Sequence, residues 1–466
     1  LIFKDQSFKL PKELLQNGLK PMLMNLSDHE KLTVHGMKAL SKVLELLIAH
    51  FKVEIGKKLL DHLDSWCKID VLDRMFGKDI TDELPTKVII SIVNVFYLLP
   101  PQADMFLGDL VLKVMLLEKK MRLQLDSPFR KPLAKFLNRF HQTTLQYFLK
   151  NLQSRPLVHF ICSIVCLAES KDLYAGFAAS IEQFLNFYIS SISTNPTRCV
   201  SFFSNSIDIF ETMVNREGDS WLLKNKPTLM KLKNMSALVK QTIRSNNIYI
   251  DHTQFNQATG TLQAQYLRYL ELTLGEENNS QLFIEFVEFL ADIEIPIIPF
   301  FKKFIYEKVV ASDNCFLKTS YLYHSLQYVS KHMENETSFY LLKNVVNLIL
   351  VFEGSAQNSL RSLFPDNIDY SQDSTAQAKD EWLPIVVESF WKNTTLFASN
   401  IVPSSLDSLK FELIQLTACI VKWAPDVVEG HKKDIVKFGW SFIKLSDPLC
   451  KQAAYILISY FIAGVA

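Results

Sequence analysis

The residues DHEKLTVHGMKALSKVLELLIAHF, at positions 28–51, decide the fold class. Their large apolar side chains recur at steps of three, four, three, one and three residues: Met37, Leu40, Leu44, Leu47, Ile48 and Phe51. An α-helix completes a turn in 3.6 residues, so this spacing places all of these side chains on one face. The stretch therefore predicts a long amphipathic helix.

The same period recurs along the whole chain. It is found in Leu14–Leu26, Lys87–Leu99, Met105–Leu123, Pro156–Leu167, Leu173–Ile192, Leu262–Leu274, Gln281–Leu290, Phe316–Val329, Phe339–Val351, Leu406–Val421 and Ile435–Ile443. We find no alternating strands joined by Asn-Gly or Asp-Gly turns. Short breaks join the expected helices, and pairs of helices recur about every 40 residues, which is the HEAT-type spacing. We therefore predict an all-α, HEAT-type helical-hairpin solenoid (an α–α superhelix) rather than a compact bundle, with each hairpin burying one face on its neighbours.

Several breaks carry helix-start signals. Asp447 precedes Pro448, Ser127 precedes Pro128, and Ser404 is followed three residues later by Asp407. A side-chain oxygen at the N-cap accepts a hydrogen bond from a backbone N–H that has no partner within the helix, and proline is tolerated at the first helical position. These signals predict the first turns of three helices.

Composition excludes several functional classes. Of 466 residues, 48% are hydrophobic and 21% charged, which is too apolar for a disordered chain. The net charge of +1 favours neither a nucleic-acid coat nor an acidic tail. There are 13 glycines, and no two lie closer than Gly430 and Gly439, so G-x-G-x-x-G, Walker A and G-x-S-x-G motifs are all absent. H-R-D and D-F-G kinase motifs are absent too. We predict no catalytic residues, no bound cofactor and no enzymatic activity in this segment.

A metal site or a disulfide framework is not expected either. The seven cysteines are scattered and contain no C-x-x-C, a pattern that suits a reducing compartment. Cys162 and Cys166 share a helical face with His159 nearby, but their surroundings are apolar and favour core packing. We predict no metal. The longest apolar stretches, Val88–Leu99, Val345–Phe352 and Ala453–Ala466, fall short of the 18 to 20 residues that a membrane span needs.

Polar stretches divide the chain loosely. We expect helical repeats over 1–214, an irregular polar connection with a helix over 215–261, and further repeats over 262–364. The polar segment 365–381 is expected to be a mobile loop, followed by repeats over 382–466. The chain begins without methionine and stops inside an apolar run, so we expect both ends to be cut from a longer polypeptide.

Charge is segregated locally. One short stretch holds Lys113, Lys119, Lys120, Arg122, Arg130, Lys131, Lys135 and Arg139, with only Glu118 and Asp126 as acids. A second basic stretch follows Trp221, and residues 276–294 are acidic. Such runs are usually the solvated faces of amphipathic helices. The alternative is a basic surface for an acidic protein segment or for nucleic acid.

Three stretches resemble a known family. LLQNGLKPMLMNLSDHEKLTVHGMKALSKVLELLIAHFKVEIGKKLLDHL (Leu14–Leu63), LLPPQADMFLGDLV (Leu98–Val111) and SPFRKPLAKFLNRF (Ser127–Phe140) resemble the mid-chain solenoid of the transcription-associated pseudokinases, called TRRAP in animals. The fungal members are closest in character. The family is related to the phosphatidylinositol-3-kinase-like kinases, and its very large chains combine HEAT repeats, a FAT region and a kinase-like domain without catalytic residues.

The resemblance implies a nuclear scaffold. Members of this family are shared subunits of histone acetyltransferase assemblies, the SAGA coactivator and the nucleosomal H4 acetyltransferase complex, where they dock transcriptional activators. Acetyltransferase subunits and activators are therefore the expected partners, without direct membrane contact and with nucleic acid contacted indirectly if at all. If an acidic activator binds here, we expect it to meet Lys119, Lys120, Arg122, Arg130 and Lys131. The alternatives are the HEAT region of an active kinase of the wider family, or a nuclear transport receptor.

Overall fold

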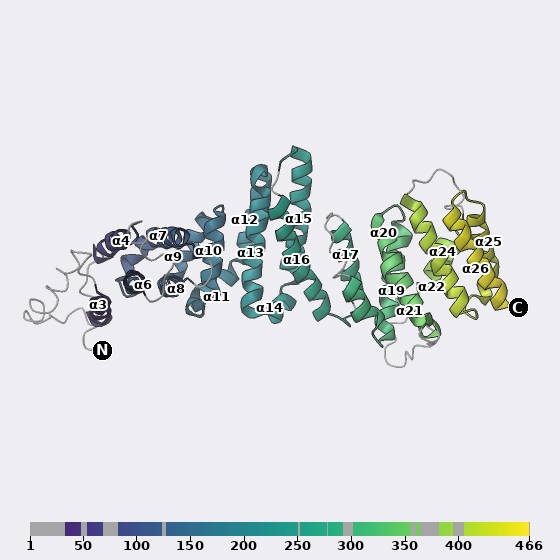
Figure 1. Ribbon diagram of the computed structural model, residues 1–466, viewed down its shortest axis with the longest axis horizontal. Coiled ribbons are helices and arrows are strands. Elements are labelled where there is room, and N and C mark those ends of the chain that lie inside the picture. The colour runs from purple at the N-terminus through teal and green to yellow at the C-terminus, as the bar shows by residue number, and fades with distance from the viewer. Residues whose placement is uncertain are drawn as a thin grey trace, which may run out of the picture. The chain divides into compact units, whose positions relative to one another are not determined.

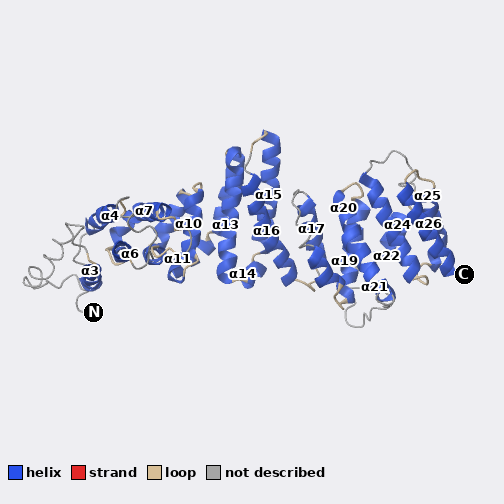
Figure 2. Ribbon diagram, viewed as in Figure 1, coloured by secondary structure: helices blue, strands red, loops and turns tan. Residues whose placement is uncertain are grey.

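The computed structural model describes residues 33–47, 54–68, 83–123, 127–249, 252–276, 278–291, 302–355, 360–363, 382–394 and 405–465. Over these residues the secondary structure is helical, with no strand (Figure 2). The all-α prediction is confirmed. Contacts divide the chain into two compact units, Leu1–Leu262 and Gln263–Ala466.

The described helices of the first unit follow one another along the chain (Figure 1). They are α3 (Val34–Leu47), α4 (Glu54–Trp66), α6 (Leu84–Phe96), η5 (Pro101–Phe106), α7 (Leu107–Lys120), α8 (Arg130–Arg139), α9 (His141–Lys150), α10 (Arg155–Val165), η6 (Ala168–Ser170), α11 (Lys171–Ala179), α12 (Ile181–Thr194), η7 (Pro196–Arg198), α13 (Cys199–Glu217), α14 (Asp219–Lys224) and α15 (Lys226–Asn246). The next helix, α16 (His252–Leu272), contains the boundary between the units.

Packing in the first unit follows the rule of a helical-hairpin stack. Helices α3 and α6 pack together, and the series continues through α8, α10, α13 and α15. Other helices flank this series: α4 contacts α6, and α9 contacts α11. On the opening helix, Met37, Leu40 and Leu44 are buried as their spacing predicts. Between α9, α11 and α12, the rings of Phe148, Phe177 and Phe184 lie with centroids 5.1–5.4 Å apart. Each hairpin thus buries its apolar face on its neighbours.

The second unit continues the pattern. Its elements are α17 (Asn279–Ala291), η8 (Ile305–Val310), α19 (Cys315–Lys331), α20 (Glu336–Leu341), η9 (Leu342–Val346), α21 (Asn347–Ser355), η10 (Leu360–Leu363), α22 (Trp382–Val386), η12 (Val387–Trp391), α24 (Ser405–Trp423), η13 (Glu429–His431), α25 (Lys432–Ile443) and α26 (Pro448–Val465). Here α21 packs on α24, α24 on α26, and α25 on α26. Among the described helices, none is both long enough and apolar enough to cross a membrane.

Helix α24 is held by buried polar contacts from π-helical neighbours. The Asn347 amide, just after π-helix η9, donates to the Glu412 carboxylate at 2.7 Å and to the Glu412 carbonyl at 3.1 Å. The Trp391 indole, at the end of π-helix η12, donates to the Thr417 hydroxyl at 3.0 Å. Because a buried polar atom without a partner is costly, these bonds fix the register of α24 against the preceding hairpin.

The structure corrects the expected irregular connection over 215–261. Apart from breaks at Gly218, near 225 and at 247–249, the described part of this stretch is helical, in α13, α14, α15 and α16. Gly218 (φ 71°, ψ −151°) ends α13 in a conformation open essentially to glycine. The buried face of α16 includes Thr259 and Gln263, which a search for apolar residues does not count.

The single helix expected over Leu173–Ile192 is divided at Ser180 into α11 and α12. The Ser180 N–H bonds to the Phe177 carbonyl at 3.1 Å, which tightens the last turn of α11. The expected loop over 365–381, the Leu14–Leu26 helix and the Ser404 signal lie outside the described residues. The Asp447 signal is confirmed, because its carboxylate accepts from the Cys450 N–H at 2.8 Å at the start of α26.

Candidate protein-interaction surface

The predicted basic residues gather where α7 ends and α8 begins. At the end of α7 the Leu123 N–H bonds to the Glu118 carbonyl at 2.9 Å, and the Arg122 N–H bonds to the Lys119 carbonyl at 3.3 Å. These two bonds define a Schellman motif, in which the residue after the C-cap takes a left-handed conformation. That residue is Arg122, with φ 54°. The motif turns the chain sharply and projects the basic residues at the end of the helix.

Four of the five predicted patch residues are exposed. Lys119 and Lys120 occupy the last turn of α7, Arg122 follows in the turn, and Lys131 lies in the first turn of α8. Lysines near a helix C-terminus also interact favourably with the helix dipole, so part of their role is local. Lys120 Nζ donates to the Cys67 carbonyl at 3.4 Å. We call these four residues, Lys119, Lys120, Arg122 and Lys131, the basic surface.

Arg130 differs from its four neighbours. Its Nη2 lies 2.9 Å from Glu118 Oε2 and its Nε lies 3.0 Å from Glu118 Oε1, a bidentate pair between α8 and α7. The two side chains are only 15% and 6% exposed, and the guanidinium stands 5.7 Å from the centre of the Phe160 ring. Arg130 therefore fastens two helices together, and its charge is already compensated by Glu118. We place it beneath the basic surface as a structural residue.

The rest of this basic stretch is engaged within the first unit. Lys113 pairs with Asp64, and Lys135 Nζ donates to Asn94 Oδ1 at 3.4 Å. Arg139 donates to the Tyr97 carbonyl and stacks on the Phe140 ring. These contacts link α8 to α6 and α7 to α4. They support the interpretation that many charges in the run are solvated helix faces with local partners.

The other charged stretches are dispersed. Lys231 of the second basic stretch pairs with Glu182 of α12. From the acidic stretch, Glu276 lies in the turn after α16, while Glu285 and Glu288 are half-buried on α17. Glu277, Asp292 and Glu294 are outside the described residues.

The cysteine pair shows no ligand geometry. Cys162 is buried, and burial raises the pKa of its thiol, as expected for core packing. Cys166, the C-cap residue of α10, is exposed instead. His159 is exposed as well. Over the residues that the structure describes, no group of three or more His, Cys, Asp or Glu side chains could hold a metal ion.

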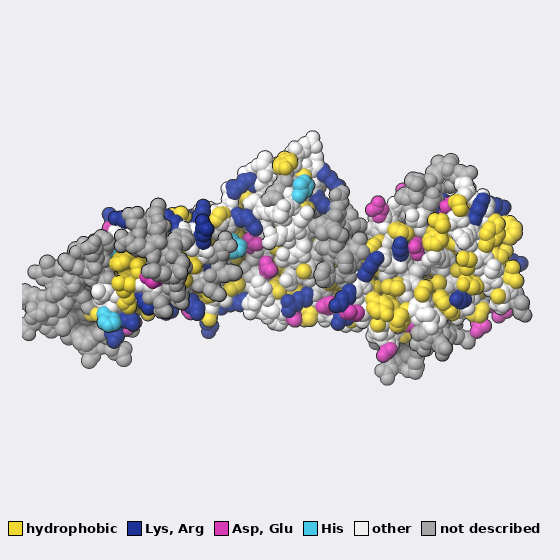
Figure 3. Space-filling view, in the orientation of Figure 1, with side chains coloured by type: hydrophobic (Ala, Val, Ile, Leu, Met, Phe, Trp, Pro, Cys, Tyr) yellow, Lys and Arg dark blue, Asp and Glu magenta, His cyan; other side chains and the backbone are white. Residues whose placement is uncertain are grey.

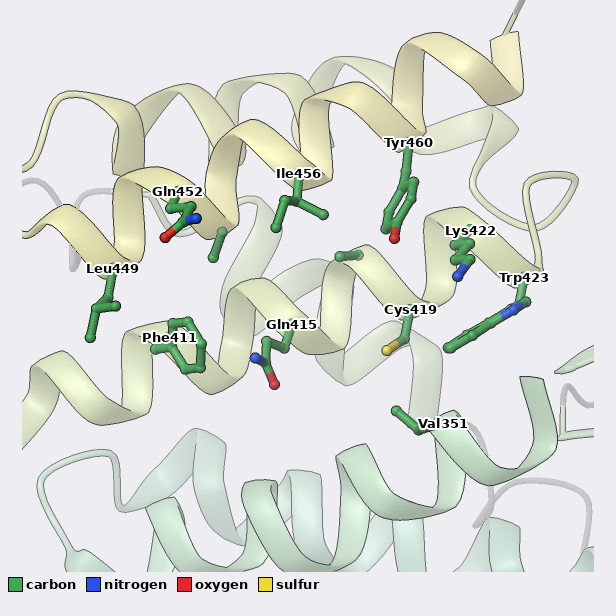
Figure 4. Close-up of a pocket in the computed structure, with 12 residues that line it drawn as sticks. Val351, Phe411, Gln415, Cys419, Lys422, Trp423, Leu449, Gln452, Ile456 and Tyr460 are labelled. Atoms are coloured by element: carbon green, nitrogen blue, oxygen red, sulfur yellow. The ribbon is translucent and has the colours of Figure 1, made fainter. Parts of the chain in front are cut away.

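An apolar groove in the second unit was not anticipated from the sequence. It lies along α24 and α26 beside α21 and has a volume of about 370 Å³ (Figure 4). Its lining residues are Val351, Phe411, Gln415, Ala418, Cys419, Lys422, Trp423, Leu449, Gln452, Ala453, Ile456 and Tyr460. In the space-filling view, hydrophobic side chains gather over the C-terminal helices (Figure 3). No motif marks this groove, because it is assembled from three helices whose faces meet only in the fold.

The chain matches known proteins over almost its whole length. A family model described as the Tra1 HEAT repeat ring region matches residues 2–464. The Saccharomyces cerevisiae protein named SAGA complex/NuA4 acetyltransferase complex subunit TRA1 is 48% identical over 458 residues, covering 98% of this chain and 12% of that protein. The Schizosaccharomyces pombe SAGA complex/NuA4 acetyltransferase complex subunit Tra1 is 28% identical over 463 residues, again 98% and 12%.

A more distant relative is the human Transformation/transcription domain-associated protein, which is 21% identical over 499 residues, or 97% of this chain and 12% of that protein. The chain thus spans about an eighth of the length of the relatives it matches.

The stacked hairpins and their exposed surfaces define the class: a HEAT-repeat solenoid, a fold that presents an extended surface to other molecules. The family match then gives the particular assignment. The chain belongs to the Tra1 HEAT repeat ring region family. The resemblance seen in the first 140 residues is confirmed, and it extends over the remainder of the chain.

Proposed function

We propose that this chain is a non-catalytic scaffold segment of a nuclear histone acetyltransferase coactivator subunit. The observation that carries the proposal is the 48% identity to a yeast SAGA and NuA4 acetyltransferase complex subunit across nearly all of this chain. A solenoid contributes to such an assembly by geometry, because it holds several partners at defined separations and raises their effective concentration. The segment would bring transcriptional activators and acetyltransferase subunits together.

We further propose that the basic surface contacts an acidic segment of an activator. Lys119, Lys120, Arg122 and Lys131 are exposed, and Glu118, one of the two acids in this stretch, is already paired with Arg130. Clustered charge of one sign attracts an oppositely charged partner and raises its association rate. Because exposed charges act through water, the attraction should weaken steeply with salt.

Purification of the full-length protein from nuclei tests the scaffold role. We expect acetyltransferase subunits in the mass spectrum and histone acetyltransferase activity in the eluate. Transport factors in their place, or phosphotransfer activity without acetyltransferases, would favour a transport receptor or an active kinase and overturn the proposal.

Charge reversal tests the basic surface. The triple variant Lys119→Glu, Lys120→Glu, Lys131→Glu in the full-length protein should weaken binding of a purified acidic activation segment by at least about tenfold at low salt. Lys224→Glu is the control, because Lys224 is an exposed lysine in the last turn of another helix of the same unit, α14. Equal binding by the triple variant and the native chain would remove the basic surface from the proposal and leave the scaffold role standing.

A further inference from the structure

The groove along α24 and α26 has the periodicity of a helix-binding site. On α24 its lining residues Phe411, Gln415, Cys419 and Trp423 follow each other at steps of four. On α26 they are Leu449, Ala453, Ile456 and Tyr460, at steps of four, three and four. Figure 4 shows the two rows running side by side, from Phe411 and Leu449 at one end to Trp423 and Tyr460 at the other. Two such rows form a trough that can take the ridge of another helix.

Several apolar side chains of the trough are exposed, and its length is that of a short helix. Leu449 is 63% exposed, Ile456 46% and Val351 43%. Large apolar side chains grouped at this level of exposure mark interaction sites more often than isolated ones do. With a rise of about 1.5 Å per residue, the distance along α26 from Leu449 to Tyr460 corresponds to about three helical turns.

One positive charge stands at the Trp423 end of the groove. Lys422 Nζ lies 4.7 Å from the centre of the Trp423 ring and 5.2 Å from that of Tyr460. No described carboxylate forms an ion pair with it, since the Glu412 side chain of the same helix is turned inward to Asn347. The nearby Cys419 thiol is neutral at physiological pH, because burial raises its pKa to about 11. A cation beside apolar surface favours a carboxylate on whatever binds there.

The groove is distinct from the face through which hairpins stack. Stacked helices contact their two neighbours through opposite sides, so a further hairpin would meet α26 on the side away from α24. The groove instead lies on the side of α26 that adjoins α24. Ile456 lines the groove, whereas Tyr455, one residue earlier and about 100° around the helix, does not. Repeat stacking therefore leaves the groove available to a separate molecule.

We propose that this groove binds an amphipathic helix of a partner protein, about three turns long, with an aspartate or glutamate facing Lys422. Its apolar side chains, at positions i, i+4 and i+7, enter the trough between Phe411, Ile456 and Leu449, as in other helix-in-groove complexes. The carboxylate at one end sets the direction in which the helix lies. The groove is a binding site separate from the basic surface, and its occupation does not require an activator.

Site-specific photo-crosslinking in the full-length protein within its assembled complex tests this inference. Benzoylphenylalanine replaces Leu449, and in a matched sample it replaces Lys437, an exposed residue of α25 outside the groove. We expect the probe at 449 to link to a peptide of a different protein, with apolar residues at helical spacing and an acidic residue at one end. A link to this chain, a link to a second copy, the same products from position 437, or no link would each overturn the proposal.

Charge reversal then tests the orientation. In the Leu449 probe background, Lys422→Glu should reduce the crosslink more than about tenfold, because like charges then face each other in an apolar site. Lys437→Glu, with the same charge change, should leave it intact. Exchanging the partner's acidic residue for lysine should restore the crosslink to Lys422→Glu. An unchanged yield with Lys422→Glu would overturn the assignment, while co-purified acetyltransferase activity reports separately on the scaffold role.

Discussion

The basic surface of the first unit and the groove of the second present opposite kinds of binding chemistry. The first consists of exposed cations around a helix end, drawn from a run visible in the sequence. The second is an apolar trough with one lysine, built from residues spread between Val351 and Tyr460. A run of basic residues in the sequence therefore contains more charges than the binding surface it forms, because some of them make structural contacts. An apolar binding site is hard to detect in the sequence, because its residues have the same pattern as core residues.

The largest effect is expected at Arg130, the residue of the predicted basic patch that is not exposed. Glu118→Ala removes the carboxylate that makes a bidentate pair with the Arg130 guanidinium, whose side chain is 15% exposed. Removing one partner of a fully buried ion pair costs about 3–5 kcal/mol, and we expect a cost near the lower end of that range. Hydrogen–deuterium exchange should speed up across α7 and α8. Lys131→Ala, at an exposed neighbouring residue, should change local stability by less than about 0.5 kcal/mol. Equal effects for the two variants would contradict the structural role of Arg130 and place it with the exposed residues of the basic surface.

The second prediction concerns a substitution that displaces a side chain lining the groove. A Cβ on Gly354, in α21, would lie closer to the Trp423 ring than van der Waals contact allows. Gly354→Ala must therefore displace that indole. Overpacking of this kind costs about 1–3 kcal/mol. We expect a lower thermal midpoint and a change in Trp423 fluorescence. Gly430→Ala is the matched control because its added methyl meets nothing within 4 Å. An unaltered midpoint for Gly354→Ala would show that the ring moves freely.

The third prediction tests the helix that carries half of the groove. Asp447 caps α26, and hydrogen bonds from the Cys450 thiol and from the Cys450 and Leu449 N–H groups stabilise its carboxylate and lower its pKa. The cap is therefore fully present above the unfolded pKa of about 4 and is lost as pH falls through the lower folded value. Asp447→Ala should cost about 1 kcal/mol at neutral pH. In this variant, hydrogen exchange in the first turn of α26, divided by the intrinsic exchange rates, should depend little on pH below about 4, because no carboxylate cap remains to be lost. Acid-sensitive exchange in the variant would contradict this account.

The fold class could be predicted because it depends on local periodicity. The buried residues Met37, Leu40 and Leu44 stand where a 3.6-residue period places them. The prediction of an irregular connection failed over 215–261 because burial there also involves serine and threonine, as at Ser236 and Thr259. A count of apolar residues registers only part of such a helix. Polar composition alone was therefore a poor guide to irregular structure.

The candidate sites could be predicted less well. Lys119, Lys120 and Lys131 are exposed as expected, but the pairing of Arg130 with Glu118 needs two helices to meet, across a separation of twelve residues. The groove needs three helices, and Val351 and Tyr460 are more than a hundred residues apart. Such contacts depend on how hairpins stack, which no single periodic stretch specifies.

The smallest expected effect separates charge from fold at the basic surface. Arg122 holds a left-handed conformation (φ 54°) that glycine adopts without steric cost, so Arg122→Gly removes a cation while relieving strain. We expect the α7–α8 connection to gain about 0.5–1 kcal/mol, measured as slower exchange of the Leu123 amide that bonds to the Glu118 carbonyl. Arg122→Ala removes the same charge but keeps the strained backbone, so it should weaken activator binding equally without the gain in stability. If glycine destabilised the turn instead, the arginine side chain would have to hold the motif together, and the basic surface would be as structural as the Arg130–Glu118 pair beneath it.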